Sequence, residues 1–156
     1  MTQNESLRND LVAVLKAGHS HSTMDQVIAA WSASSRGSKP GDANHSAWQL
    51  LEHLRIAQWD ILAFSLSADH VSPEFPDGYW PDTEAPPSDG AWDQSVGQFA
   101  KDLEAMQSLV SDPATDLHAR ILHGDGQTIL REALTLASHN SYHIGQLMTL
   151  RKVLGV

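Results

Sequence analysis

Three of the nine histidines in this 156-residue chain occupy positions where an imidazole should point inward. His139 and His143 are spaced i, i+4 in a long helical segment, which places both rings on one face of a helix. At about 100° per residue, His143 falls inside the apolar stripe of that segment and His139 lies at its edge. His53 points into the same core from an earlier helical segment. The pattern predicts three inward imidazoles on two facing helices.

Metal binding is the chemistry that this arrangement favours. Burying three imidazoles costs free energy unless each ring finds a partner. One divalent cation would satisfy all three, and three protein ligands leave a position open for water or substrate. The alternative is that the three side chains are satisfied within the core, because a histidine pair at this spacing is by itself often incidental. Residues 140–142 contain no glutamate, which excludes the zinc-protease motif H-E-x-x-H.

Helical segments must position these side chains, and the apolar spacing predicts four long ones. We expect helices over residues 6–16, from 44 or 46 to about 66, over 91–111 and over 128–154. A shorter helix should begin after a cap at Ser22 or Thr23 and run through Trp31. Strand patterns are weak, so we expect an all-α, antiparallel four-helix bundle that forms a single domain over residues 1–156.

A proline-rich segment separates the second and third long helices. Residues 67–90 hold five of the seven prolines together with Tyr79 and Trp80. Proline at this density excludes a helix, and the aromatic residues favour an ordered loop over the surface or over a pocket mouth. The role of Pro73–Pro87 stays open between a wall of a substrate pocket and simple packing.

Composition narrows the functional classes. The formal net charge is −9 and no cluster of Lys and Arg offsets it, which argues against nucleic acid as a partner. The absence of cysteine excludes disulfides, cysteine nucleophiles and cysteine-ligated metal centres. No run approaches the roughly 18 apolar residues of a membrane span, and the polar N-terminus has no signal pattern. We therefore expect a cytoplasmic protein without a membrane partner.

Three segments carry distinctive residues: 48–54 (WQLLEHL) with 57–60 (AQWD), 76–81 (PDGYWP) and 139–146 (HNSYHIGQ). Together they resemble the damage-inducible DinB-like superfamily, and the resemblance covers roughly residues 5–155. It implies a four-helix bundle that is usually a homodimer. It also implies a divalent metal ion held by His53, His139 and His143. Imidazole ligands suit zinc, nickel and iron alike, so the metal is not specified.

The resemblance also indicates an activity, because relatives include metal-dependent S-transferases that use low-molecular-weight thiols such as bacillithiol, and mycothiol-dependent isomerases. A metal-bound thiol is deprotonated at neutral pH, so a cation could supply the thiolate that a cysteine-free chain lacks. Two alternatives stay open. One is a hydrolase that uses metal-bound water, and the other is a non-catalytic protein that binds a small molecule or a metal.

The sequence assigns no catalytic residue, but several side chains near the histidines are candidates for supporting roles. Asp60 and Glu132 lie seven residues from a candidate ligand, about 10 Å along a helix, which favours a supporting or structural role. Gln49 and Gln146, one turn from a ligand, could orient a water molecule or bond between helices. Tyr142 is a candidate proton donor. The other histidines are expected in solvent or in loops without metal: His19, His21, His45, His70, His118 and His123.

Overall fold

The computed structural model describes residues 2–16, 22–29, 31–41 and 43–156. Its helices are α1 (Gln3–Leu15), α2 (Met24–Ile28), α3 (Ala47–Leu66), the 3₁₀ turn η1 (Asp77–Tyr79), α4 (Ala91–Ser111) and α5 (Ile129–Leu154). Within the described residues the only β pairing is an isolated bridge between Arg120 and Thr128. The predicted all-α class is confirmed. In this part of the chain, no helix has the combined length and apolar character that crossing a bilayer requires.

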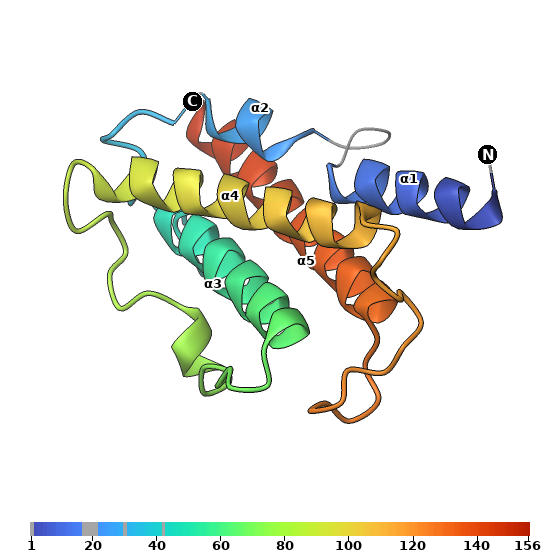
Figure 1. Ribbon diagram of the computed structural model, residues 1–156. Coiled ribbons are helices and arrows are strands. Elements are labelled where there is room, and N and C mark those ends of the chain that lie inside the picture. Colours follow the sequence, from blue (N-terminus) through green and yellow to red (C-terminus); the bar gives the residue numbers. More distant parts are fainter. Residues whose placement is uncertain (1, 17–21, 30, 42) are drawn as a thin grey trace.

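The four long helices form the predicted bundle, with α2 added at one end. α3 packs against α4 and α5, and α1 packs against the same two helices. In Figure 1, α3 and α5 run side by side while α4 passes in front of them, and α2 lies beside the C-terminal end of α5. The pairing of α3 with α5 matters most for function, because these two helices carry the three inward histidines.

Capping boxes begin three of the helices. Thr2 caps α1 with Glu5, Thr23 caps α2 with Gln26, and Ser46 caps α3 with a glutamine at the third position. In each box the hydroxyl accepts the amide of the third residue, whose side chain accepts the amide of the cap. The predicted start of the first helix at residue 6 is therefore three residues late, because the apolar stripe begins after the cap does.

The predicted C-terminal end is wrong for the short helix α2 and confirmed for the long helix α5. The α2 helix ends at Ile28 rather than at Trp31. The Trp31 amide bonds to the Ile28 carbonyl at 3.1 Å, so the chain turns tightly while the indole stays in the core. The end of α5 is as predicted, because Gly155 caps it in the left-handed conformation with φ +71°, which glycine adopts without strain.

The core consists of two apolar clusters with a polar layer beside them. One cluster joins α2 to the N-terminal halves of α3 and α4 and the C-terminal half of α5, and the other joins α1 to the opposite halves. Buried Gln58 donates to the Phe99 carbonyl at 2.6 Å and accepts from buried Asn140 at 2.9 Å, which links α3, α4 and α5. Because Asn140 directly follows His139, the histidines lie near the level of this layer.

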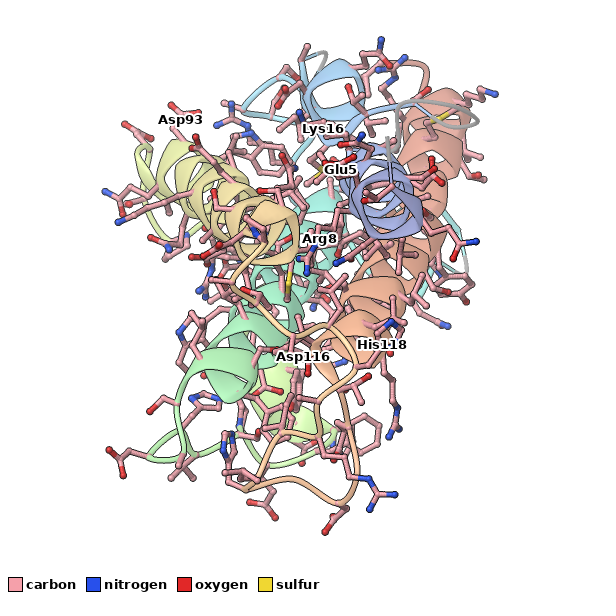
Figure 2. The ribbon with its side chains drawn as sticks, turned by 45° about the vertical axis from the view of Figure 1, so that its right-hand side comes forward. Glu5, Arg8, Lys16, Asp93, Asp116 and His118 are labelled. Atoms are coloured by element: carbon pink, nitrogen blue, oxygen red, sulfur yellow. The ribbon has the colours of Figure 1, made fainter. Side chains whose placement is uncertain are left out.

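The buried side chain of Arg8 caps the C-terminal end of α4. The Arg8 guanidinium points from α1 toward the segment that follows α4 (Figure 2). It donates to the carbonyls of Val110 and Asp112 at 2.8 Å each and to that of Thr115 at 2.6 Å. A positive charge at a helix C-terminus neutralises carbonyls that lack partners within the helix. Periodicity cannot reveal this role, because Arg8 looks like any polar residue beside an apolar stripe.

Candidate metal centre

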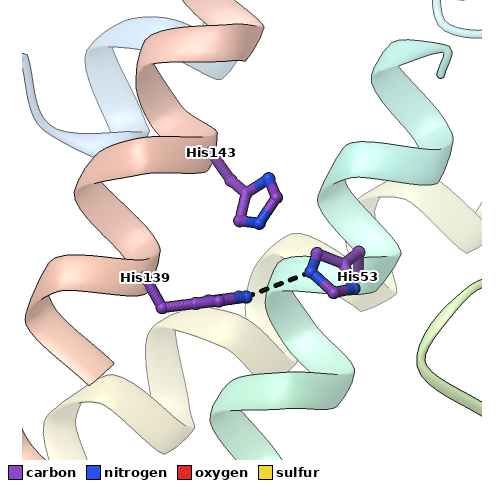
Figure 3. Close-up of side chains that lie close together, drawn as sticks. All are labelled: His53, His139 and His143. Carbon is purple, nitrogen blue, oxygen red and sulfur yellow. Dashed lines mark hydrogen bonds between the residues drawn. The ribbon is translucent and has the colours of Figure 1, made fainter. Parts of the chain in front are cut away.

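The three predicted histidines come together between α3 and α5. His53 projects from α3, while His139 and His143 project from successive turns of α5 (Figure 3). One ring nitrogen of each lies within 4.8 Å of the others, and the Nε2 atoms of His53 and His139 are 3.0 Å apart. Two nitrogens bound to one tetrahedral zinc lie about 3.3 Å apart, given zinc–nitrogen bonds of about 2.05 Å. The cluster could therefore hold a single divalent cation.

Hydrogen bonds on the outer side of the cluster fix two of the rings. Nδ1 of His53 donates to the main-chain carbonyl of Tyr79 at 2.9 Å, and Nδ1 of His143 donates to Oε1 of Gln146 at 2.7 Å. Each bond leaves Nε2 unprotonated and facing the cluster, which is the tautomer a metal requires. In the structure, Nε2 of His53 accepts a hydrogen bond from Nε2 of His139. Nδ1 of His139 is buried without a hydrogen bond. This donor set fits a single divalent metal ion.

Trp80 supports the cluster from the proline-rich loop. Its indole lies flat against the His53 ring, with centroids 4.0 Å apart and planes 3° apart. The His45 ring covers the opposite face at 3.8 Å and 13°. Trp80 also lines a pocket beside the histidines. Burial and nearby Lys39 lower the pKa of His45.

A buried carboxylate ties the same loop to α3. Oδ1 of Asp60 pairs with Nε2 of His70 at 2.7 Å, and Oδ2 accepts the hydroxyl of Tyr79 at 2.7 Å. Burial and the bond to Asp60 raise the pKa of Tyr79 to about 12, so the phenol stays protonated and donates. The main-chain carbonyl of Tyr79 accepts from His53, so Asp60 is connected to a candidate ligand through this one loop residue. We call Asp60, His70 and Tyr79 the loop clamp.

The pocket beside the cluster has a volume of about 860 Å³ and reaches His143. Tyr142 and Gln146 line it next to that histidine. The Tyr142 side chain is exposed, and its hydroxyl accepts from Nε2 of Gln146 at 3.3 Å. The volume is typical of small-molecule sites. Tyr142, weighed from sequence as a proton donor, thus lies in the pocket and beside a candidate ligand.

Other residues singled out from sequence have different roles. Gln49 completes the capping box of α3, where its Oε1 accepts the amide of Ser46. Glu132 is buried, and burial raises its pKa, but it does not join the histidine group. His123 bonds to the Phe64 carbonyl and His118 is exposed. His19 and His21 lie outside the described residues.

Electrostatics within the cluster disfavour a charged imidazole. Burial, followed by the neighbouring imidazoles, lowers the pKa of His139 to about 4. Burial is also the main cause that lowers the pKa of His143 to about 4, although the bond to Gln146 opposes it. Both rings are therefore neutral at pH 7, the state in which imidazole binds a metal.

These shifts predict that the metal-free chain loses stability in mild acid. The unfolded chain takes up protons near the ordinary histidine pKa of 6.5, whereas the folded chain resists them down to about 4. The stability is therefore fully present above pH 6.5 and falls as the pH drops from about 6.5 to 4. Urea unfolding at pH 7.5, 6.0 and 5.0 measures it. The double variant His139→Gln with His143→Gln should lose less stability over this range, and an equal loss would contradict the prediction.

The fold and the cluster together define a class: an all-α bundle with a three-histidine centre that could hold a divalent metal ion. Comparison with family models matches the DinB superfamily over residues 19–147, and the chain belongs to this superfamily. The resemblance read from the sequence motifs is thereby confirmed. No curated protein and no solved structure matches the chain significantly.

Proposed function

We propose that His53, His139 and His143 bind one divalent metal ion, either zinc, nickel or iron, and that the protein transfers a low-molecular-weight thiol to an electrophile. The observation that carries the proposal is the pairing of the histidine cluster with the adjoining pocket. Two rings present Nε2 inward because their Nδ1 atoms are occupied, and the pocket reaches the third ligand in the chain, His143. A bound ion would supply the Lewis acidity that makes a coordinated thiol a thiolate at neutral pH.

The chain's own residues would hold and orient the reactants. Tyr79 and Gln146 keep the rings of His53 and His143 in the metal-binding tautomer. Because the Tyr142 hydroxyl accepts from Gln146, its proton is free to donate to a group in the pocket. Trp80 excludes water from one side of His53 by covering the ring face.

The positions of the carboxylates favour thiol transfer over hydrolysis. A hydrolase needs a base near the metal-bound water, yet no carboxylate joins the histidine group among the described residues. Glu52, beside His53 in sequence, pairs with Arg55 and bonds to Ser95. Asp60 is occupied by the loop clamp. Thiol transfer requires no such base, because the thiol proton can pass to solvent.

The test is a coupling reaction between a thiol and monochlorobimane. In it a carbon–sulfur bond forms, chloride leaves and the thiol proton goes to buffer, so the fluorescent adduct reports the rate. Protein loaded with each metal should exceed both the chelator-treated protein and the loaded His143→Ala variant, with bacillithiol and glutathione as the thiols. Rates equal to these controls would overturn the transferase. Ester and amide hydrolysis by the same samples would support the hydrolase, and metal occupancy without turnover would support a non-catalytic binding protein.

A further inference from the structure

We infer that the pocket beside His143 binds an uncharged molecule with an apolar body and a hydrogen-bond acceptor near the histidines, and that its lining, with no metal bound, favours this molecule over an anion of the same shape. The inference deepens the proposed function and rests on it in one respect: this molecule would be the electrophile of the transfer, whereas the thiol would be held by the metal. The pocket itself, with its volume of about 860 Å³, is described independently of any metal.

The lining divides the pocket into an apolar end and a polar end. Much of the apolar lining comes from Pro40, Leu50, Leu150 and Val153, among which the uncharged polar side chains of Asn44 and Thr149 also line the pocket. The polar end is at His143, where Tyr142 and Gln146 also line the wall. A ligand that fills the pocket would therefore bury an apolar body while one end reaches the histidines.

Charge is what the lining lacks. Among the described residues that line the pocket, none is Lys, Arg, Asp or Glu. Lys39, next to Pro40, pairs with Glu84, and Arg151, next to Leu150, donates to the main-chain carbonyls of Gln26 and Val27. Lys152, next to Val153, is exposed and does not line the pocket. A carboxylate or phosphate entering the pocket would lose hydration without gaining a counter-charge. In the metal-free protein, the net charge of −9 adds a long-range repulsion of anions.

The polar end offers donors, which indicates what the ligand must present there. Oε1 of Gln146 is taken by His143, whereas Nε2 uses one of its two hydrogens on Tyr142. The Tyr142 hydroxyl accepts that bond and keeps its own hydrogen. Two N–H or O–H groups thus remain to donate, and they fit a carbonyl or ether oxygen of the ligand.

The experiment compares two probes of nearly the same shape at pH 7.5. One is 2-naphthamide, which is uncharged, and the other is 2-naphthoate, which is an anion. Calorimetry gives each affinity, and the indole N–H resonance of Trp80 shows whether the probe occupies the pocket. Chelator-treated full-length protein is used, because a carboxylate could otherwise bind a metal directly. Val153→Arg places a cation at an exposed lining position, and Leu66→Arg is a matched control on an exposed leucine at the end of α3.

We expect naphthamide to bind at least about 10-fold more tightly than naphthoate and to shift the Trp80 resonance. The ratio of the two affinities should be smaller in Val153→Arg and unchanged in Leu66→Arg. Equal affinities, tighter binding of naphthoate, or no binding of either probe would overturn the inference. So would binding that leaves Trp80 unmoved. If the amide preference holds while the bimane reaction fails, the transferase alone is overturned. If the transfer succeeds while the preference is absent, the inference about the pocket alone is overturned.

Discussion

Replacing His143 by alanine should remove the metal from the protein. We expect wild-type chain, dialysed without chelator, to carry about one zinc, nickel or iron ion, and the variant to carry less than about a tenth as much. The reason is that a divalent ion at this site would have three imidazole ligands from the protein. The variant would offer only two, which bind the ion much more weakly. Elemental analysis of both proteins measures the metal content. Calorimetry should show that the variant binds the ion at least about 100-fold more weakly, which exceeds the loss expected when only a hydrogen bond to a ligand is removed.

The matched control for this loss is His118→Ala. His118 is exposed and lies outside the cluster, so its variant should retain full occupancy. His139→Ala and His53→Ala should behave like His143→Ala. A wild-type chain that takes up no ion after incubation with each metal would contradict the prediction, and it would mean that the histidines satisfy one another in the core. Retention of the ion in all three alanine variants would place the binding site elsewhere.

Weakening the loop clamp should lower metal affinity without removing a ligand. Asp60→Asn loses the charge that holds His70, and Tyr79→Phe loses the hydroxyl bonded to Asp60 while keeping the carbonyl on His53. Each change lets the loop, and with it that carbonyl, move relative to His53. Partners of this kind are worth about 10- to 100-fold in metal affinity, and we expect about 10-fold for each variant in competition with a chelator.

Two further measurements separate positioning from general destabilisation. The ¹⁵N shifts of His53 in the metal-free protein report the fraction with Nδ1 protonated, which should fall in the clamp variants. Asp102→Asn is the control, because Asp102 is also a buried carboxylate but lies on α4 and accepts from Gln98. It should leave both the affinity and the His53 shifts unchanged. Clamp variants that bind metal as tightly as wild type, with unchanged shifts, would refute the positioning role.

The ligand candidates could be found from sequence because each depends on helical periodicity alone. His53, His139 and His143 face inward for the same reason that the leucines around them do. The helices were predictable on the same basis, with errors of a few residues where a cap lies outside the apolar stripe, as at Thr2. Periodicity is a property of one segment of the chain, and so are the bounds of a helix and the face on which a side chain lies.

The supporting contacts could not be found in this way, because they join segments distant in sequence through loop geometry. The bond from His53 to Tyr79 uses a main-chain carbonyl, which carries no residue-type signal. The pairing of Asp60 with His70 depends on how the proline-rich loop folds back on α3. One signal was available: Asp60 lies seven residues from His53 and on nearly the same helical face, which indicated a supporting role but not its partners.

The separation between the ligands and the pocket lining has an evolutionary consequence. The three imidazoles project from α3 and α5. The pocket is lined by residues 40 and 43–45, by Trp80 and by side chains of α5, and His143 belongs to both groups. Substitutions at residues 40 and 43–45 would therefore reshape the pocket while leaving the three candidate ligands in place. Under the proposed function, a lineage could change its substrate through these positions and keep the chemistry of the metal site.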